Sequence, residues 1–209
     1  MIIAIDGLSV NGKTTLAKKI SKELNIKYFN TGAIYRCIAL EIIEKNLDIN
    51  DIEKVLEEIK DIQVNFIDDK IYLNDIDVTE KIYTEEISVK STLWATNLKI
   101  KELVRKIQKE HINKYDTIIE GRDVCTRIAP NADFKFYLYS DFELRLKRLA
   151  KDKPNINIEE LRKNLKLRDD LDLNGGNFVK PVDAFEINTS DLNIEEVLKI
   201  IINKIKKKK

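Results

Sequence analysis

Eight residues near the amino terminus have the types and spacing needed to bind phosphate. Gly7-Leu8-Ser9-Val10-Asn11-Gly12-Lys13-Thr14 matches the pattern G-x-x-x-x-G-K-[ST] between an apolar run and a helical apolar pattern. Glycines allow the backbone to fold around an anion, N–H groups at a helix start supply partial positive charge, and Lys13 adds a full charge. The pattern predicts a loop that binds a nucleoside triphosphate, with the Thr14 hydroxyl as a ligand of Mg²⁺.

Basic side chains follow two further apolar runs. Glu120-Gly121-Arg122-Asp123 ends one run, and Asn30-Thr31-Gly32 leads from another into a helical pattern that contains Arg36. We interpret these arginines, with three later ones, as cations for phosphate chains: Arg36, Arg122, Arg145, Arg148 and Arg168. Three alternatives stay open. In the first, Arg122 and Asp123 form a structural ion pair. In the second, Thr31 is only a helix cap, and in the third, most of the arginines are solvated surface residues.

The composition of the site suits transfer of a phosphoryl group to a phosphate acceptor. A phosphate monoester, with a second pKa of about 6, is mostly a dianion at neutral pH and needs no general base. The reaction instead needs positive charge and exclusion of water. His111 is the only histidine. A His dyad, a His triad or a multi-His metal site is therefore disfavoured.

Five short segments predict the strands that carry these loops: residues 2–6, 26–30, 117–120, 134–139 and 184–188. Most of them are near-continuous apolar runs, as expected for parallel strands buried on both faces. Apolar residues at helical spacing alternate with them. The last helical pattern, residues 194–205, follows Asn193 as the predicted N-cap. The alternation predicts a doubly wound α/β fold with helices on both faces of a parallel sheet.

Two stretches interrupt this alternation. Residues 62–80 alternate with period two around Asp68-Asp69 and around Asp75, which predicts a small antiparallel meander. Residues 150–180 are polar, and Pro154 and Gly175-Gly176 flank a weakly amphipathic helix. This second stretch is interpreted either as a lid or as a solvated surface excursion.

Composition excludes several classes of protein. The 209 residues include 37 Lys and Arg against 36 Asp and Glu, so the chain lacks the basic surplus of a nonspecific nucleic-acid binder. It has no apolar run of membrane-spanning length. Cys37 and Cys125 lie far apart, which excludes a disulfide framework or zinc knuckle and favours two small buried residues. We expect a cytoplasmic protein with one core and room for small subdomains.

Two strings match the guanine-binding motifs of GTPases. Asp172-Leu173-Asn174-Gly175 fits D-x-x-G, and Asn113-Lys114-Tyr115-Asp116 fits N-K-x-D. In a GTPase, D-x-x-G comes first along the chain and each motif follows a strand. Here the order is reversed, so a GTPase switch is disfavoured.

Taken together, five blocks resemble the bacterial cytidylate kinases, a family of nucleoside monophosphate kinases. The blocks are IDGLSVNGKTT, FNTGAIYR, LNDIDVTEKIYTEEIS, IIEGRDVCT and LRDDLD. They occur in the family's order and extend over nearly the whole chain. The resemblance implies transfer of the γ-phosphoryl of ATP to CMP or dCMP, with Mg²⁺ as cofactor. The alternatives are a kinase of the same fold with another acceptor, such as UMP, and a nucleotide-binding regulatory module.

The resemblance also assigns roles to single residues. Those implied to bind ATP are Gly7, Leu8, Ser9, Val10, Asn11, Gly12, Lys13, Thr14 and Thr15. Those implied to bind the acceptor are Thr31, Arg36, Thr92, Lys101, Arg122, Asp123, Arg168 and Asp172. Lys13, Arg122, Arg148 and Arg168 are the implied catalytic residues.

The resemblance further implies three parts. These are a P-loop core (residues 1–31, 115–149 and 178–209), an acceptor-binding subdomain (residues 32–114, with the β insert around 62–80) and a lid (residues 150–177). Expected partners are the small molecules ATP and CMP or dCMP, with no nucleic acid or membrane, and the chain is expected to act as a monomer.

Six residues depart from the family pattern, and two of them, Leu171 and Leu173, occupy positions that are often charged in the family. Lys101 and Gly175 replace expected arginines, and Leu8 and Val10 replace the loop's usual Pro and Gly. Because Val10 is β-branched, we expect its backbone to adopt a conformation that such a residue tolerates.

Overall fold

The computed structural model describes residues 1–67, 70–112 and 115–207. Its contacts divide the chain into two compact units. Unit 1 comprises Met1–Phe29 and Ile112–Lys209, and unit 2 comprises Asn30–His111. The turn expected at Asp68-Asp69, and Asn113 and Lys114 of the N-K-x-D string, lie outside the described residues.

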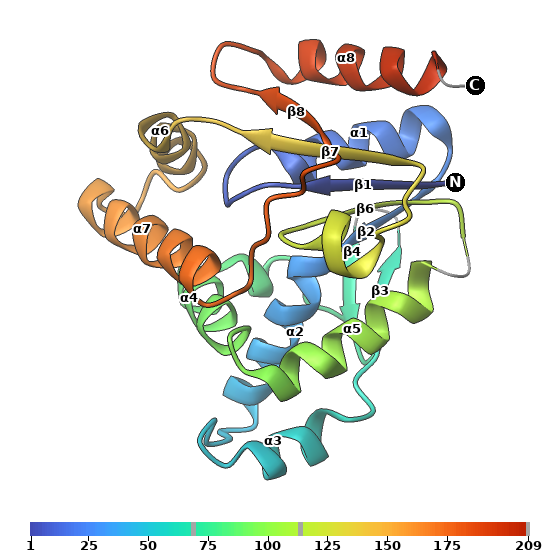
Figure 1. Ribbon diagram of the computed structural model, residues 1–209. Helices are drawn as coiled ribbons and strands as arrows, with labels where there is room; N and C mark the ends of the chain where they lie inside the picture. The colour runs from blue at the N-terminus through green and yellow to red at the C-terminus, as the bar shows by residue number, and fades with distance from the viewer. Residues whose placement is uncertain (68–69, 113–114, 208–209) are drawn as a thin grey trace. The chain divides into compact units, whose positions relative to one another are not determined.

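Unit 1 is built on a five-stranded sheet with the order β2-β6-β1-β7-β8 (Figure 1). The strands are β1 (Ile2–Asp6), β2 (Lys27–Asn30), β6 (Thr117–Gly121), β7 (Phe134–Tyr139) and β8 (Phe185–Asn188). The five predicted strands are confirmed to within one residue at each end. The pairings β1–β6, β1–β7 and β7–β8 are parallel. The chain therefore reverses its direction of winding at β1, where ligands bind in open α/β sheets.

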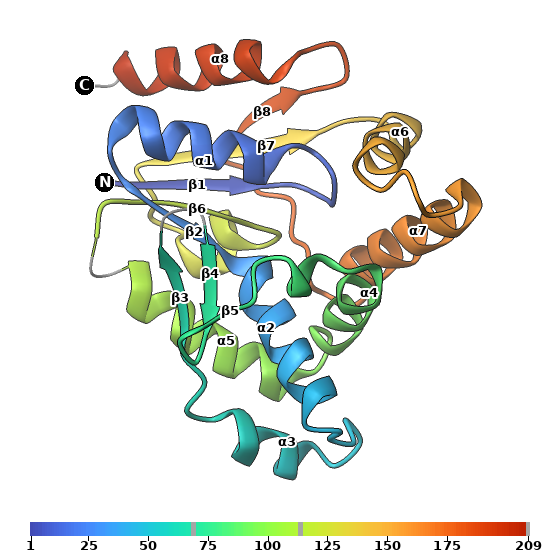
Figure 2. The same ribbon diagram turned by 180° about the vertical axis from the view of Figure 1, so that it is seen from behind.

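Two helices cover one face of this sheet. Leu16, Ala17 and Ile20 of α1 (Lys13–Leu24) pack with apolar residues of β1 and of α8 (Ile194–Lys206) in one fully buried cluster. Figures 1 and 2 show α1 and α8 side by side. The predicted cap of α8 is confirmed, since Asn193 accepts hydrogen bonds from two backbone N–H groups and forms a capping box with Glu196. This packing fixes the start of α1, and with it the loop after β1.

Three further helical segments complete unit 1. They are a π-helical turn, η2 (Val124–Ile128), and two helices, α6 (Phe142–Asp152) and α7 (Ile158–Asn174). Leu146 and Leu149 of α6 pack on Leu161 and Leu165 of α7 in a separate small cluster. The sequence predicted a helix around Leu161, which is confirmed, but it did not predict α6 or η2.

Unit 2 is a helical layer with a small sheet. Its helices are α2 (Thr31–Glu44), α3 (Ile52–Ile59), α4 (Glu85–Trp94) and α5 (Leu98–Ile112), with a 3₁₀ turn η1 (Lys81–Tyr83). The strands β3 (Val64–Ile67), β4 (Lys70–Leu73) and β5 (Ile76–Asp77) form an antiparallel sheet, which confirms the predicted meander (Figure 2). Asn30, rather than Thr31, caps α2, because the Asn30 side chain accepts from Ala33 N.

Among the described helices, none is long and apolar enough to cross a membrane.

Candidate active site

The loop between β1 and α1 has the backbone geometry of an anion-binding turn. Gly7 has φ +154°, and a Cβ atom there would lie 2.2 Å from the carbonyl oxygen of Leu138. Gly12, at φ +78°, starts α1 and offers no side chain to the first N–H groups of the helix. Only glycine fits the first position, and the second leaves the positive end of α1 facing the loop.

Val10 adopts the left-handed backbone conformation, with φ +62°. The expectation of a β-branched-compatible backbone is therefore wrong, because a β-branched residue rarely adopts this region. The half-buried Val10 side chain packs against the cluster formed by α6 and α7. Apolar contact thus offsets local strain and joins the loop to these helices.

Lys13 is buried inside the loop, and its Nζ donates a hydrogen bond to Leu8 O at 2.8 Å. Burial, with a smaller contribution from the charge of Arg122, lowers the pKa of Lys13 to about 7. The nearby carboxylates of Glu120, Asp172 and Asp6 act in the opposite direction. A polyphosphate bound in the loop would supply the negative charge that favours the ammonium form.

The Thr14 hydroxyl donates to Glu120 Oε1 at 2.8 Å, and Tyr28 OH lies 3.2 Å from the same oxygen. Glu120 is buried at the carboxyl end of β6. Its carboxylate orients the Thr14 hydroxyl and leaves the hydroxyl oxygen with lone pairs for a cation. None of the described residues forms a group of three or more His, Cys, Asp or Glu that could enclose a metal. The donors present therefore fit a Mg²⁺ ion that takes its other ligands from phosphates and water.

Arg122 connects the loop after β1 to α7. Its Nη1 donates to Gly7 O at 3.1 Å, its Nη2 to Ser9 Oγ at 2.7 Å, and its Nε to Asp172 Oδ2 at 2.7 Å. Burial alone would lower the pKa of Arg122, but Asp172 and Glu120 raise it. The guanidinium is thus held beside the phosphate-binding loop in its charged form.

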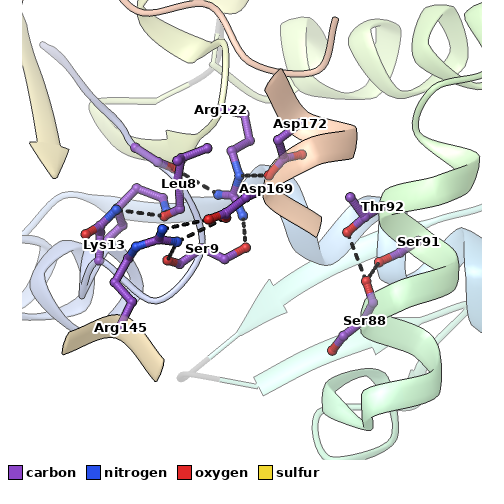
Figure 3. A network of polar contacts seen from close by, with 12 residues as sticks. Leu8, Ser9, Lys13, Ser88, Ser91, Thr92, Arg122, Arg145, Asp169 and Asp172 are labelled. Carbon is purple, nitrogen blue, oxygen red and sulfur yellow. Dashed lines mark hydrogen bonds and ion pairs between the residues drawn. The ribbon is translucent and has the colours of Figure 1, made fainter. Parts of the chain in front are cut away.

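A second arginine makes a parallel connection. Arg145 of α6 forms a bidentate ion pair with Asp169 of α7, at 3.0 Å and 2.6 Å, and its Nη1 donates to Ser9 O at 3.2 Å. Both partners are buried, and the Arg145 guanidinium also lies 5.4 Å from the centre of the Phe142 ring. Figure 3 shows Arg122 and Arg145 both directed at Ser9, each with its own α7 carboxylate.

A cavity of about 370 Å³ lies on the other side of the loop. Asn11, Gly12 and Thr15 line it together with Leu192 and Ile194, which precede and begin α8. Arg148 of α6 closes one wall and donates to Thr189 O at 2.7 Å and to Thr189 Oγ1 at 3.3 Å. A larger cavity, of about 740 Å³, is lined by residues at the amino ends of β7 and β8 and includes none of the loop. The smaller cavity adjoins the predicted phosphate site, so it is the candidate for the base of a bound nucleotide.

Two more predicted residues lie in unit 1. Asp123 follows β6, and its Oδ2 lies 3.4 Å from Arg127 Nη1. Arg168 is buried on α7, beside Asp169 in the sequence. The hydrogen bonds of Arg122 and Arg145 described above join the loop, Asp172 and Asp169 into one network within unit 1.

The remaining predicted residues belong to unit 2, where hydrogen bonds hold the Arg36 guanidinium. Its Nη1 donates to Ser88 Oγ at 2.6 Å and to Ile82 O at 3.0 Å, and its guanidinium lies over the Tyr83 ring. On α4, the Thr92 hydroxyl donates to Ser88 O at 2.9 Å (Figure 3). Lys101 is buried on α5, and Thr31 is buried at the first position of α2.

Four residues in or beside the network of unit 1 were not assigned roles from the sequence. They are Asp6, Glu120, Asp169 and Arg127, and Arg145 was predicted only as a general cation. Two of the four lie beside the network: Asp6 accepts hydrogen bonds from Val124 N and Cys125 N, and Arg127 donates one to Gly176 O. Asp6 and Glu120 had a usable signal, since each ends a buried strand at the edge where ligands bind. Asp169 had none, because its partner Arg145 is remote in the sequence, and Arg127 had only the i, i+4 spacing to Asp123, since its other partner, Gly176, is remote.

Comparisons of the sequence with known proteins agree on one family, and comparison with solved structures bears on the fold. A family model described as cytidylate kinase matches residues 3–207. A cytidylate kinase of Clostridium acetobutylicum is 35% identical over 99% of this chain and 98% of that protein. A cytidylate kinase of Fusobacterium nucleatum is 35% identical over 100% of this chain and 99% of that protein. A shikimate kinase structure from Bacteroides thetaiotaomicron, at 12% identity, covers 99% of this chain and 98% of that chain with a TM-score of 0.52, which supports the α/β kinase fold.

Proposed function

The chain belongs to the cytidylate kinase family, and on this basis we propose that it transfers the γ-phosphoryl group of ATP to CMP or dCMP, giving ADP and CDP or dCDP. The observation that supports this most directly is the position of Arg122, which contacts Gly7 and Ser9 of the phosphate-binding loop and Asp172 of α7. A cation at this place can neutralise charge where two phosphate chains meet.

ATP is assigned to unit 1. The triphosphate is proposed to lie in the loop from Gly7 to Thr15, against the N–H groups of α1 and the ammonium of Lys13. The adenine is assigned to the cavity of about 370 Å³ beside Arg148. Thr14, oriented by Glu120, would hold Mg²⁺, which when bound supplies charge neutralisation to the β- and γ-phosphates.

Residues proposed to bind the acceptor occur in each unit, considered by itself. In unit 1 these are Arg122, Asp123, Arg168 and Asp172, and in unit 2 they are Thr31, Arg36, Thr92 and Lys101. Arg36 is suited to phosphate because Ser88 and the Ile82 carbonyl already fix its orientation. A carboxylate such as Asp123 accepts hydrogen bonds from the exocyclic amine of cytosine, which uracil lacks.

This chain's own residues perform the reaction without a general base, because the acceptor phosphate is already a dianion. Lys13, Arg122 and Arg168 would stabilise charge on the transferring group, and Arg148 would hold the donor nucleotide. Residues 150–177, which include α7, are proposed to act as a lid over ATP that keeps water from the γ-phosphate. We propose a cytoplasmic monomer, in keeping with small cytoplasmic substrates.

The proposal is tested by measuring ADP formation from ATP and Mg²⁺ with CMP, dCMP, UMP and AMP offered separately. We expect CMP and dCMP to dominate; preference for UMP or AMP would contradict the assigned acceptor. Lys13→Ala should reduce turnover by roughly 100-fold or more, whereas Arg122→Ala should chiefly raise the KM for CMP. Lys19→Ala, which removes a partly exposed ion pair between α1 and Glu195 of α8, is the matched control.

A further inference from the structure

Arg127 is an arginine of η2 that joins two parts of unit 1. Its Nη1 donates to Gly176 O at 2.7 Å and lies 3.4 Å from Asp123 Oδ2. Gly176 follows the end of α7, whereas Asp123 follows β6. One guanidinium therefore bridges the loop after β6 and the turn after α7.

The turn that carries Arg127 is held in place by a buried carboxylate. Asp6 Oδ1 accepts from Val124 N at 2.9 Å, and Asp6 Oδ2 accepts from Cys125 N at 2.8 Å. Within η2, Arg127 N donates to Asp123 O at 2.8 Å, so the Arg127 and Asp123 side chains, four residues apart, lie on the same side of the turn. Asp6 thus fixes the backbone from which both side chains extend.

The second partner of Arg127 is also well defined. Gly176 has φ +68°, and after it the chain folds back so that Phe178 N donates to Asp172 O at 2.9 Å. A carbonyl beyond a helix C-terminus lies in a region of negative potential that favours a cation. Arg127 therefore satisfies a carbonyl in the turn that begins at Asp172.

We propose that Arg127 is a positioning residue for recognition of the acceptor base. It fixes the rotation of the Asp123 carboxylate and ties that carboxylate to the α7 turn next to Asp172. This inference rests on the proposed function, in which Asp123 accepts from the cytosine amine and Asp172 lies at the acceptor. Arg127 itself does not touch the substrate.

The test substitutes Arg127→Met, which keeps the length of the side chain and removes its charge. We expect the KM for CMP to rise roughly three- to tenfold, with the KM for ATP unchanged, and the preference for CMP over UMP to fall. Arg127→Lys should restore part of the loss, because an ammonium reaches one of the two partners. If Arg127→Met does not fold, the same measurements on Arg127→Lys test the inference. Lys19→Met is the matched control: Lys19 pairs with Glu195 outside residues 150–177, and its side chain is 41% exposed against 36% for Arg127.

A double substitution separates positioning from general stabilisation. If Arg127 acts through Asp123, Arg127→Met should have no further effect on CMP use in an Asp123→Asn background. Equal losses in both backgrounds would overturn the inference, as would an unchanged CMP-to-UMP ratio in Arg127→Met when Asp123→Asn alters it. Failure of the wild-type protein to use CMP or dCMP would overturn the proposed function itself.

Discussion

The burial of Lys13 makes a quantitative prediction about stability and pH. Its ordinary pKa is 10.5, and burial lowers this to about 7 in the folded protein. At about 1.36 kcal/mol for each pH unit between the two values, the folded state bears a cost of roughly 5 kcal/mol when Lys13 is charged. Because the unfolded chain binds the extra proton between these two pKa values, the free energy of unfolding should rise with pH across that window.

The perturbation is Lys13→Met, which fills a similar volume without a charge. Below about pH 7 the wild-type protein carries the full cost and the variant carries none, so the variant should be the more stable. Raising the pH from about 6.5 to about 9.5 should narrow the difference by roughly 3 kcal/mol. Other titrating groups occur in both proteins, so they contribute to both curves and largely cancel in the difference.

The assay is urea unfolding of both proteins at a series of pH values, with no nucleotide present. Lys206→Met, which removes an exposed lysine at the end of α8, is the control and should run parallel to the wild type. Parallel curves for Lys13→Met and wild type would refute the reasoning, since they would mean that Lys13 titrates alike in the folded and unfolded chains.

Three further predictions follow from buried or strained groups. Because Val10 has φ +62°, Val10→Gly should be more stable than Val10→Ala by about 1 kcal/mol in urea unfolding. At Lys163, which is exposed on a helix, the alanine variant should instead be more stable than the glycine variant. Burial raises the pKa of Asp6 to about 6, so wild type should gain roughly 2 kcal/mol over Asp6→Asn as pH falls from about 6 to about 4, and a constant difference would contradict this. Burial also raises the pKa of Cys37 to about 12 and of Cys125 further, so a thiol reagent should label neither before unfolding, and rapid labelling of native protein would argue against their burial.

The strands and the long helices could be predicted because their signals are local. Strand β1 and most of the other strands of the large sheet are near-continuous apolar runs, and α8 carries both a helical stripe and a capping box. Helix α6 also carries such a stripe, because Phe142, Leu146, Leu149 and Ala150 recur at helical spacing and contact the cluster with α7, but no helix was predicted from this signal. The π-helical η2 could not be predicted from a local signal. It depends on the Asp6 carboxylate, more than a hundred residues away, which accepts from Val124 and Cys125.

The candidate site likewise has a part that local sequence predicts and a part that depends on tertiary packing. The phosphate-binding loop was predictable because its glycines, lysine and threonine lie within eight residues. The pairing of Arg122 with Asp172 and of Arg145 with Asp169 depends on how α6 and α7 fold back on the loop. Val10 shows the limit of reasoning position by position. Its local preference opposes the observed backbone, and only its packing against α6 and α7 accounts for it.

The near-neutral charge of the chain conceals where its cations lie. Arg122 and Arg145 each contact Ser9 of the loop while an α7 carboxylate, Asp172 or Asp169, holds the guanidinium. A carboxylate partner fixes the fork of an arginine, so a phosphate chain meets donors that are already oriented. The same carboxylates compete with that phosphate for the guanidinium, which sets a limit on how tightly substrate can be held. Local pairing of this kind lets a protein with 37 basic and 36 acidic residues present concentrated positive charge to phosphates without a basic surface.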